Sequence, residues 1–426
     1  MRRLALLGLV LAACSSGTPA VPTTPPPIAG VTAPPVAEIQ VRLSDIEAAA
    51  ARGVSVQVEQ TVRLTGTEPV RMTLPFDRPV MLQISYVIGE MPVEPAWSQQ
   101  VTAAEDGSTV LIVEQPWRQP VEAGEPVVLA WQAGGDSAGY LEQLAAAPGL
   151  TVTSPLWWTL DAEGSLAGEA DPQFVTDAHK LGIDVWPYVT NGFEPARTRL
   201  AIGDEAGRRR LAGQLSEAAR LSGADGVNVD FEAFSVRERD EFTAFVVELG
   251  SLVHEWGGLV SVDITAGMVP AAVLALNRYD RRALAEAADY LALMAYDEYN
   301  RTRPSGPTAS LGWTEDSLYW LLRHADPHQV LLGIPLYGRI WDPEKLSQPT
   351  TATIGTVVEL AAANDRAWDP EFGVDRVELA DGRYFWAEDY ETLRARLALA
   401  QRAGIAGTAA WRLGFDTAEV WTIISP

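Results

Sequence analysis

Short apolar runs alternate with helical patterns from about residue 125 to the end of this 426-residue chain. Helical patterns such as residues 205–221 and 236–256 separate runs whose length is typical of buried parallel strands. Eight units of a strand followed by a helix favour an α/β fold, a (β/α)8 TIM barrel rather than an open doubly wound sheet. The expected strands are residues 127–132, 150–157, 183–190, 226–231, 259–265, 290–296, 330–336 and 407–411.

The regions on either side of this regular pattern predict two additions to the barrel. The longest gap between expected strands separates the seventh from the eighth, so residues 345–387 predict an insertion with more than one helix and a hairpin at 374–385. Residues 38–124 show the period-two alternation of half-buried strands and predict a small β-rich accessory domain before the barrel at 125–426. Trp97 and Trp117 suit a glycan-binding surface there, and the alternative is a structural spacer with tryptophans in its core.

The N-terminus predicts an exported protein. Arg2 and Arg3 precede an apolar run at residues 4–13 that is too short to cross a bilayer as a helix. The run ends in Leu-Ala-Ala-Cys14, which resembles the bacterial lipobox; the alternative is an ordinary signal peptide with a cysteine near its cleavage site. We expect a signal segment at 1–14, a Pro- and Thr-rich extended tether at 15–37, and a lipid on Cys14 that anchors the protein at the cell envelope.

Composition excludes several classes of partner and cofactor. The formal net charge of −24 repels phosphate backbones and anionic headgroups, so we expect no nucleic acid partner and no contact with the membrane beyond the lipid anchor. A single cysteine excludes a disulfide framework and a cysteine-based zinc site. Because the sequence has no phosphate-binding or dinucleotide-binding loop motif, we expect no cofactor. His324 and His328 are spaced i, i+4 but have no further ligand nearby, so we expect no metal. We also expect a monomer.

The fourth expected strand carries acidic side chains where a barrel normally has apolar ones. Strand side chains alternate, so Val227, Val229 and Phe231 point one way and the polar set points the other. With the apolar set against the helices, the polar set faces the barrel interior and ends at the carboxyl end of the strand, where barrel active sites lie. The last of these, a glutamate, gains a raised pKa from burial and from the aspartate two residues earlier, which suits a general acid. This polar set is Asn228, Asp230 and Glu232.

Residues 225–232, Asp-Gly-Val-Asn-Val-Asp-Phe-Glu, resemble the DGxDxDxE signature of glycoside hydrolase family 18, the chitinase family. The sequence of this motif is most similar to that of the spore-germination and cortical-fragment-lytic branch of the family. Residues 293–297 resemble its MxYD motif, and residues 331–341 and 407–413 resemble its seventh and eighth strands. The resemblance covers about residues 125–426 and leaves the N-terminal β-rich region out.

The resemblance implies a role for each matching residue. Glu232 would protonate the glycosidic oxygen, and Asp230 would orient the 2-acetamido group of the substrate and stabilise the charged intermediate. Tyr296 would donate a hydrogen bond to the acetamido carbonyl, Asp297 would contact the same sugar, and Trp411 would stack on its face. In this family the acetamido carbonyl itself is the nucleophile, which departs from the scheme of two opposed carboxylates and requires an N-acetylated sugar.

Two departures from the family pattern and two further candidates complete the expected substrate-binding set. Asn228 stands where the wider family has aspartate, although the germination branch carries the same asparagine. Residues 187–192 replace the SxGG element of strand three, and Asn191 there is either a hydrogen-bond partner of the sugar or a turn residue. Asp263 on strand five is either a subsite residue or satisfied within the core, and Tyr337 either lines the cleft or belongs to the core.

These features predict an envelope-anchored glycosidase that hydrolyses β-1,4 bonds next to N-acetylglucosamine in peptidoglycan. An anchored envelope enzyme meets wall glycan before any other polymer. One alternative is hydrolysis of chitin or chito-oligosaccharides by the same residues. Another is a catalytically weak glycan-binding protein, an interpretation that rests on Asn228.

Overall fold

The computed structural model describes residues 126–267, 278–302 and 305–424, together with the backbone of six strands between residues 37 and 111. Those strands form an antiparallel sheet in the order β2-β1-β4-β5 and a separate antiparallel pair of β3 and β6. The predicted signal segment at 1–14, with Cys14, lies outside the described residues, as does the tether except for its last residue, which begins β1. The bounds are Ala37–Asp45 (β1), Gln57–Arg63 (β2), Val70–Thr73 (β3), Val80–Ile88 (β4), Met91–Val101 (β5) and Ser108–Leu111 (β6).

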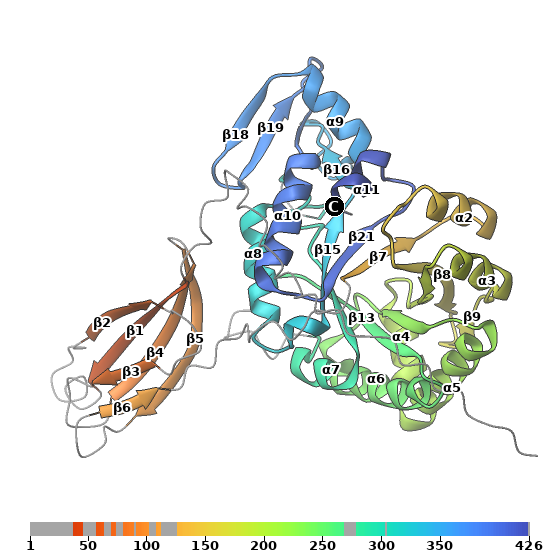
Figure 1. Cartoon of the computed structure of the whole chain (residues 1–426), viewed down its shortest axis with the longest axis horizontal. Helices are drawn as coiled ribbons and strands as arrows, with labels where there is room; N and C mark the ends of the chain where they lie inside the picture. Colours follow the sequence, from red (N-terminus) through yellow and green to blue (C-terminus); the bar gives the residue numbers. More distant parts are fainter. Residues whose placement is uncertain are drawn as a thin grey trace, which may run out of the picture.

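The remainder of the described chain contains eight parallel strands that close into a barrel, which confirms the predicted fold class (Figure 1). The strand order is β8-β11-β12-β13-β14-β15-β21-β7, and pairing of β7 with β8 closes the ring. A short strand, β10, precedes β11 and also pairs with β8, and β9 forms a small antiparallel flap on β8. The bounds are Val127–Gln132 (β7), Val152–Leu160 (β8), Leu166–Ala167 (β9), Asp184–Val185 (β10), Tyr188–Thr190 (β11), Gly226–Asp230 (β12), Leu259–Thr265 (β13), Tyr290–Met294 (β14), Val330–Pro335 (β15) and Gly407–Trp411 (β21).

The strand expected at residues 183–190 is interrupted in the structure. Its two halves, β10 and β11, are separated by Trp186 and Pro187. Proline has no N–H to donate to a neighbouring strand, so a continuous ladder is broken at this point. The remaining expected strands differ from the observed ones only at their ends.

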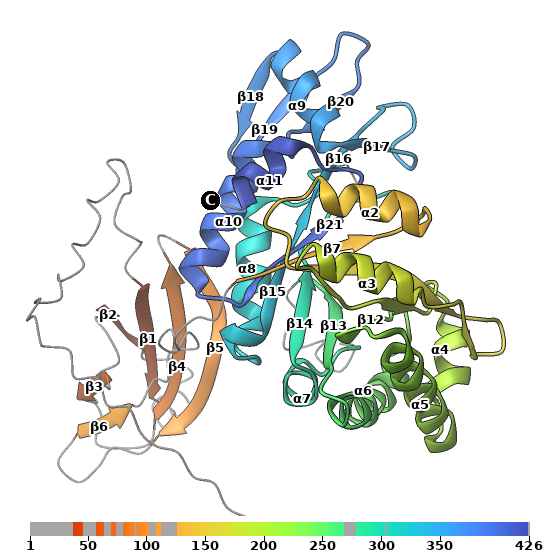
Figure 2. The ribbon, with the colours of Figure 1, turned by 45° about the vertical axis from the view of Figure 1, so that its right-hand side comes forward.

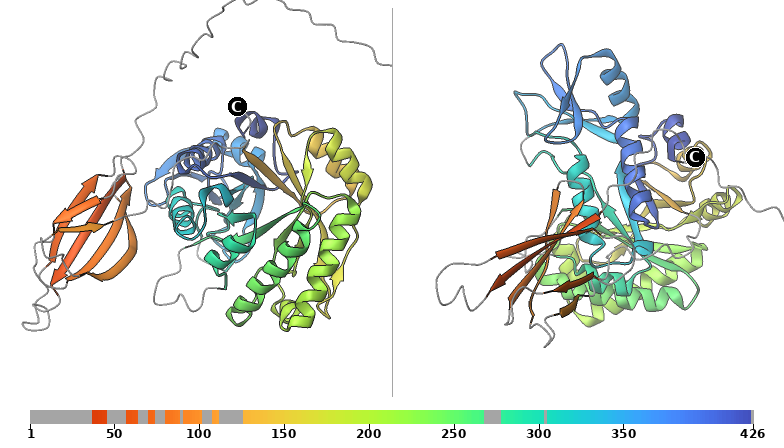
Figure 3. Two further views of the ribbon diagram at one scale, coloured as in Figure 1. Left: turned by 60° about the horizontal axis from the view of Figure 1, so that its bottom comes forward. Right: turned by 60° about the vertical axis from the view of Figure 1, so that its left-hand side comes forward.

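Helices lie around the outside of the barrel strands (Figures 2 and 3). The helix expected at residues 236–256 is a short 3-10 turn, η1, followed directly by α6. The bounds are Ser137–Ala145 (α2), Pro172–Lys180 (α3), Pro195–Ile202 (α4), Glu205–Ser222 (α5), Val236–Glu238 (η1), Arg239–His254 (α6), Arg281–Ala287 (α7), Leu311–Leu321 (α8), Pro327–Gln329 (η3), Tyr390–Ala403 (α10) and Ala418–Ile424 (α11).

An insertion follows barrel strand β15, as predicted, and it differs from the expectation in content. Residues 345–387, all of which are described, hold one helix rather than more than one. The expected hairpin is present as β19 and β20, and β18 pairs with β19 to make a three-stranded sheet. The insertion extends beyond the carboxyl end of β15 (Figures 1 and 2). The bounds are Tyr337–Ile340 (β16), Thr350–Thr353 (β17), Ile354–Ala363 (α9), Arg366–Asp369 (β18), Val374–Glu378 (β19) and Tyr384–Trp386 (β20).

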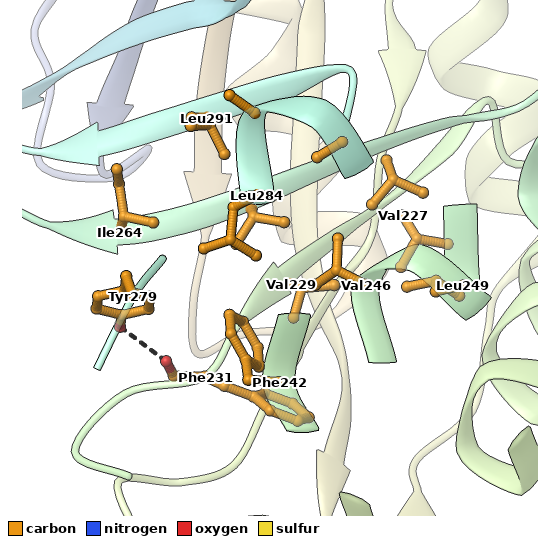
Figure 4. Packing of buried hydrophobic residues seen from close by; sticks show 14 of the residues in the cluster. Val227, Val229, Phe231, Phe242, Val246, Leu249, Ile264, Tyr279, Leu284 and Leu291 are labelled. Atoms are coloured by element: carbon orange, nitrogen blue, oxygen red, sulfur yellow. Dashed lines mark hydrogen bonds between the residues drawn. The ribbon is translucent and has the colours of Figure 1, made fainter. Parts of the chain in front are cut away.

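The apolar face of β12 is buried against helix α6, as its alternation predicts. Val227, Val229 and Phe231 are fully buried, and Figure 4 shows them packed with Phe242 of α6 and with Tyr279. The Tyr279 hydroxyl donates a hydrogen bond of 2.9 Å to the Phe231 carbonyl, which fixes the chain just past the end of the strand. Each such side chain contributes about 1.5–3 kcal/mol by leaving water, so the polar side chains of β12 are held toward the barrel interior.

The first two residues of the strand-four signature set the position of β12. The Asp225 carboxylate accepts a hydrogen bond from the Val185 backbone N–H at 2.8 Å and lies 2.8 Å from His179 Nε2. A Cβ on Gly226 would lie 2.6 Å from the Leu259 carbonyl oxygen, a separation that no other residue could accommodate without a backbone shift. These residues fix the beginning of the strand, and the acidic residues lie at its other end.

Candidate active site

A cavity of about 810 Å³ opens at the carboxyl ends of the barrel strands. The last residue of each of five strands lies on its wall: Thr190, Asp230, Thr265, Met294 and Trp411. This is the end of the barrel that carries active sites in enzymes of this fold. Of the predicted site residues, the cavity wall brings together Asp230, Glu232, Asp263, Tyr296, Asp297, Tyr337 and Trp411.

Glu232 lies half-buried on the wall, two residues after the end of β12. Burial raises the pKa of its carboxyl to about 8, with further upward contributions from the charges of Asp230 and Asp297. The positive charge of Arg278 acts in the opposite direction. A carboxyl with this pKa is protonated at neutral pH and is therefore able to donate a proton, as the sequence predicted.

The backbone of Glu232 is held by a side chain from the neighbouring strand. Asn191 Nδ2 donates to the Glu232 carbonyl oxygen at 2.6 Å, and Asn191 Oδ1 accepts from the Glu232 N–H at 3.0 Å. The next residue, Ala233, has φ of 54°, so the chain turns sharply away from the strand direction immediately after Glu232. The carboxyl is consequently presented from a fixed backbone position rather than from a free loop.

The carboxyls of Asp230 and Asp263 are both buried inside the barrel, where the charge of Asp263 acts on Asp230. Burial raises the pKa of both carboxyls well above the usual range, and the charge of Asp263 raises that of Asp230 further. Asp263 Oδ1 accepts a hydrogen bond of 2.8 Å from Asn228 Nδ2, whereas Asp230 Oδ1 is buried with no hydrogen-bond partner among the described residues. Since a buried polar oxygen without a partner is costly, Asp230 is poised to bind a group that enters the cavity.

Asn228 lies beneath the cavity, where all of its amide hydrogen-bonding capacity is used within the protein. Its Nδ2 donates to Ser261 Oγ at 2.7 Å and to Asp263, and its Oδ1 accepts from Trp131 Nε1 at 3.1 Å and from Ser154 Oγ at 3.4 Å. An amide has two donors and two acceptor positions, so none remains for substrate. The expected direct contact between Asn228 and substrate therefore does not fit this geometry.

Asn191 departs from the expectation in the same way. It is fully buried and is not on the cavity wall, and it binds the backbone of Glu232 and the Thr198 hydroxyl instead of facing a sugar. The alternative of a turn residue holds in part, because Asn191 Oδ1 also accepts the Phe193 N–H at 3.2 Å and the Asn191 carbonyl accepts the Glu194 N–H at 3.3 Å. Both ends of the amide are in addition bonded to the backbone of the residue with the raised pKa. Asn191 is a positioning residue, and so is Asn228 through Asp263.

Tyr296 presents a hydroxyl group to the cavity beside an aromatic wall. The hydroxyl oxygen is buried and has no hydrogen-bond partner among the described residues. Burial, together with the charge of Asp263, raises the pKa of Tyr296 well above its usual value, so the hydroxyl keeps its proton and can donate it in a hydrogen bond. The centroid of the Trp411 ring lies 6.3 Å from that of Tyr296 and 5.9 Å from that of Trp131, so Trp411 packs in an aromatic cluster on the cavity wall.

Asp297 is held in place from the insertion. Asp297 Oδ1 accepts hydrogen bonds of 2.5 Å from the Tyr337 hydroxyl and 2.5 Å from Arg339 Nη2, both on β16. Its backbone φ of 60° places it in the left-handed region, which non-glycine residues rarely adopt. Tyr337 is thus at once a wall residue and a support for Asp297.

Arg339 and Phe193 are among the residues near the cavity that were not predicted. Arg339 shares the face of Tyr337 because side chains two apart on a strand point the same way, so the alternation along β16 was a usable signal. Phe193 lies on the cavity wall with 61% of its surface exposed and φ of 60°. Only its place just after a barrel strand pointed to it, since the sequence gives no periodicity there.

The described residues contain no group of three or more His, Cys, Asp or Glu side chains arranged to hold a metal ion. In the same part of the chain, no helix is both long enough and apolar enough to cross a membrane.

Comparison with known proteins identifies the family. The model of the glycosyl hydrolases family 18 matches residues 191–416, a segment that contains barrel strands β12, β13, β14, β15 and β21 and the carboxylates described above. This chain belongs to glycosyl hydrolase family 18 and is a glycoside hydrolase.

Two curated relatives from Bacillus subtilis cover most of the barrel. An uncharacterized glycosylase, YvbX, is 23% identical over 306 residues, which span 68% of this chain and 88% of the relative. The cortical fragment-lytic enzyme is 23% identical over 315 residues, which span 68% of this chain and 72% of the relative. Among solved structures, a chitinase from Chromobacterium violaceum superposes with a TM-score of 0.63 at 24% identity, over 70% of this chain and 98% of that one, and supports the fold.

Proposed function

We propose that this protein hydrolyses β-1,4 glycosidic bonds next to N-acetylglucosamine in peptidoglycan, with retention of configuration and with Glu232 as general acid. The observation that carries the proposal is the arrangement of two unsatisfied polar groups, Asp230 Oδ1 and the Tyr296 hydroxyl, on the wall of the same cavity as the protonated Glu232. An acetamido group has an N–H for a carboxylate and a carbonyl oxygen for a hydroxyl, so it satisfies both.

The proposed reaction starts when Glu232 gives its proton to the glycosidic oxygen and the bond from that oxygen to C1 breaks. The acetamido carbonyl oxygen of the same sugar forms a bond to C1, and Asp230 stabilises the positive charge on the resulting ring. Glu232, now a carboxylate, takes a proton from water, whose oxygen attacks C1 and restores the acetamido group. Asp230 ends β12 and Glu232 follows it by two residues, so the two carboxyls are not expected on opposite faces of the sugar. In the proposed reaction the acetamido carbonyl replaces the nucleophilic carboxylate of the usual retaining scheme.

The choice of peptidoglycan rests on two supports. The first is the relation to a protein named as a cortical fragment-lytic enzyme. The second is the N-terminal sequence, from which we propose export and a lipid on Cys14, placing the barrel beside wall glycan. Chitin or chito-oligosaccharides would occupy the same cavity through the same acetamido group, so the polymer has to be decided by experiment.

Mass spectrometry of the soluble products from purified sacculi tests the substrate. We expect glycan fragments with new reducing ends at N-acetylglucosamine, and none from E232Q, which keeps the shape of the side chain without an acidic proton. Turnover on chitin oligomers, measured beside the sacculi, separates the two polymers. Faster release from chitin oligomers and no new reducing ends from sacculi at any pH from 5 to 8 would contradict the proposal.

Anchoring has its own test. In cells that make the full-length chain, C14A should move from the membrane fraction to the soluble exported fraction, while the wild-type protein stays with the membrane. A wild-type protein that is soluble, or a C14A variant that remains with the membrane, would contradict the proposed anchor. The result is independent of the catalytic assay, because Cys14 lies far outside the barrel in sequence.

A further inference from the structure

A second hollow, of about 590 Å³, continues from the active-site cavity. The two share Phe193, Asp297 and Asn300 on their walls, so a chain that leaves the cavity past Phe193 enters this hollow directly. Residues 347–349 and Thr351, from the insertion, form its opposite wall. We call this hollow the side groove.

The side groove differs from the cavity in charge. The cavity wall carries carboxylates: Asp230, Glu232, Asp263, Asp297 and Glu298. The side groove carries two guanidinium groups, those of Arg301 and Arg339, and shares only Asp297 with the acidic set. On a protein with a formal net charge of −24, a local excess of positive charge beside an acidic cavity is a specific feature rather than a general property of the surface.

The two arginines are not equivalent. Arg339 is already neutralised, because its Nη2 lies 2.5 Å from Asp297 Oδ1. Arg301 is exposed on the loop after β14, and no carboxylate among the described residues forms an ion pair with it. Its positive charge is therefore available to a ligand in the side groove.

We propose that the side groove binds a carboxylate carried by the sugar that neighbours the one in the cavity, with Arg301 as its charge partner. This inference rests on the proposed function: in peptidoglycan every second sugar carries a lactyl ether that ends in a carboxyl group or in a peptide with further carboxylates. Chitin carries no such group. An arginine in a groove that adjoins the cavity would thus select alternating, acid-substituted glycan over a uniform neutral one.

Binding to the inactive E232Q protein tests this without requiring turnover. The probes are soluble glycan fragments with free lactyl carboxylates, the same fragments with those carboxylates converted to amides, and fragments that keep their stem peptides. We expect the free acid to bind about three- to ten-fold more tightly than the amide at low salt, and the difference to shrink as salt rises. Adding R301Q to E232Q should bring the two affinities together.

A matched control is R210Q in the same background, since Arg210 is exposed on α5 and lines neither hollow. It should leave the ratio of the two affinities unchanged. Equal affinities for acid and amide in E232Q, or a ratio that survives R301Q, would overturn the proposal. The peptide-bearing fragments identify the source of the carboxylate. If R301Q weakened the binding of these fragments alone, the bound carboxylate would be that of the peptide.

Failure of the proposed function gives a different result. If the enzyme cleaves chitin oligomers and not sacculi, yet E232Q prefers the acid form through Arg301, the proposal for the side groove is supported and the assignment of the polymer is wrong. If sacculi are cleaved and R301Q has no effect on the ratio of affinities, the assignment of the polymer is supported and the proposal for the side groove is wrong.

Discussion

The side chain of Asn191 binds both backbone polar groups of Glu232. Asn191 Nδ2 donates to the Glu232 carbonyl oxygen at 2.6 Å, and Asn191 Oδ1 accepts from the Glu232 N–H at 3.0 Å. This pairing imitates one rung of a sheet at the place where β11 and β12 have already ended. Glu232 therefore keeps the orientation of a strand residue although it lies two residues beyond its strand.

N191A should lower kcat by about 10- to 100-fold while KM changes little, because a displaced acid affects proton transfer more than sugar binding. Unfolding should also become easier, by about 2–4 kcal/mol, since buried backbone groups lose their partners. Steady-state kinetics and urea denaturation measure the two effects. T198V is the matched control: it removes the other acceptor of Asn191 Nδ2 and leaves both bonds to Glu232, so kcat should stay near wild type. Equal loss in both variants would show that the effect is general destabilisation.

E232Q should reduce turnover by about 10²- to 10⁴-fold, the usual contribution of a general acid. Stability gives an independent readout. The folded pKa of about 8 lies above the ordinary value of 4.5, so between these pH values the folded protein retains a proton that the unfolded chain has lost. Glu232 therefore makes the folded state less stable as pH rises from about 4.5 to 8. Thermal melts across this range should fall less steeply for E232Q than for the wild type, and parallel curves would contradict the raised pKa.

The alkaline limb of kcat/KM should lie near pH 8, because activity is lost as Glu232 gives up its proton. Two substitutions should move the limb in opposite directions. R278Q removes a positive charge that lowers the pKa of Glu232, so the limb should move to higher pH; D297N removes a negative charge that raises the pKa, so the limb should move to lower pH. Profiles of both variants on a soluble oligosaccharide provide the measurement. Shifts of the same sign would mean that another group controls the limb.

N228D should destabilise the protein rather than improve catalysis. The new carboxyl would replace a donor that lies 2.8 Å from Asp263 Oδ1, so two acceptors would face each other unless one of them binds a proton. The loss of unfolding free energy should be about 2–4 kcal/mol at pH 8 and smaller at pH 5, where that proton is available. Urea denaturation at the two pH values checks this, with S261A as a control that removes the second acceptor without adding charge. A loss that does not depend on pH would contradict the explanation.

F193A should raise KM for glycan oligomers by about three- to ten-fold and leave kcat nearly unchanged, because an exposed aromatic ring at the junction of the cavity and the side groove offers a stacking surface without touching the acid. Phe193 is 61% exposed, so removal of its ring should cost little stability. Trp368 on β18 is 63% exposed and lies on neither wall, which makes W368A the matched control. If both variants had the same KM as wild type, Phe193 would have no part in binding.

The barrel and the acidic end of β12 could be predicted from the sequence because both follow from local patterns. Strand period fixes which side of β12 carries Asp230, and the apolar residues Val227 and Val229 decide that this side faces inward. The same reasoning failed for Asn228 and Asn191, since it gives the direction of a side chain and not the depth at which the chain places it. Which partners satisfy an amide depends on neighbouring strands, as with Trp131 and Asn228, which are 97 residues apart in sequence.

The interior of the insertion was predicted less well for a related reason. Residues 366–369 carry no apolar alternation, and three of the four are exposed, so their strand exists by pairing with β19 rather than by its own pattern. The side groove could not be predicted from the sequence either, because its walls come from the loop after β14 and from the insertion, which are far apart in the chain. Phe193 belongs to neither segment, and only the folded chain brings all three together.

The insertion begins on β16, whose Tyr337 and Arg339 both bind Asp297 at the mouth of the barrel. An insertion that is exchanged as a unit would thus bring with it the two side chains that bind Asp297. Glu232 and its support from Asn191 would stay with the barrel. Exchange of residues 337–388 between relatives should for this reason alter which polymers are accepted while the bond-breaking step is conserved, and a graft that starts after Arg339 should keep the host's own two side chains and tolerate a foreign outer wall.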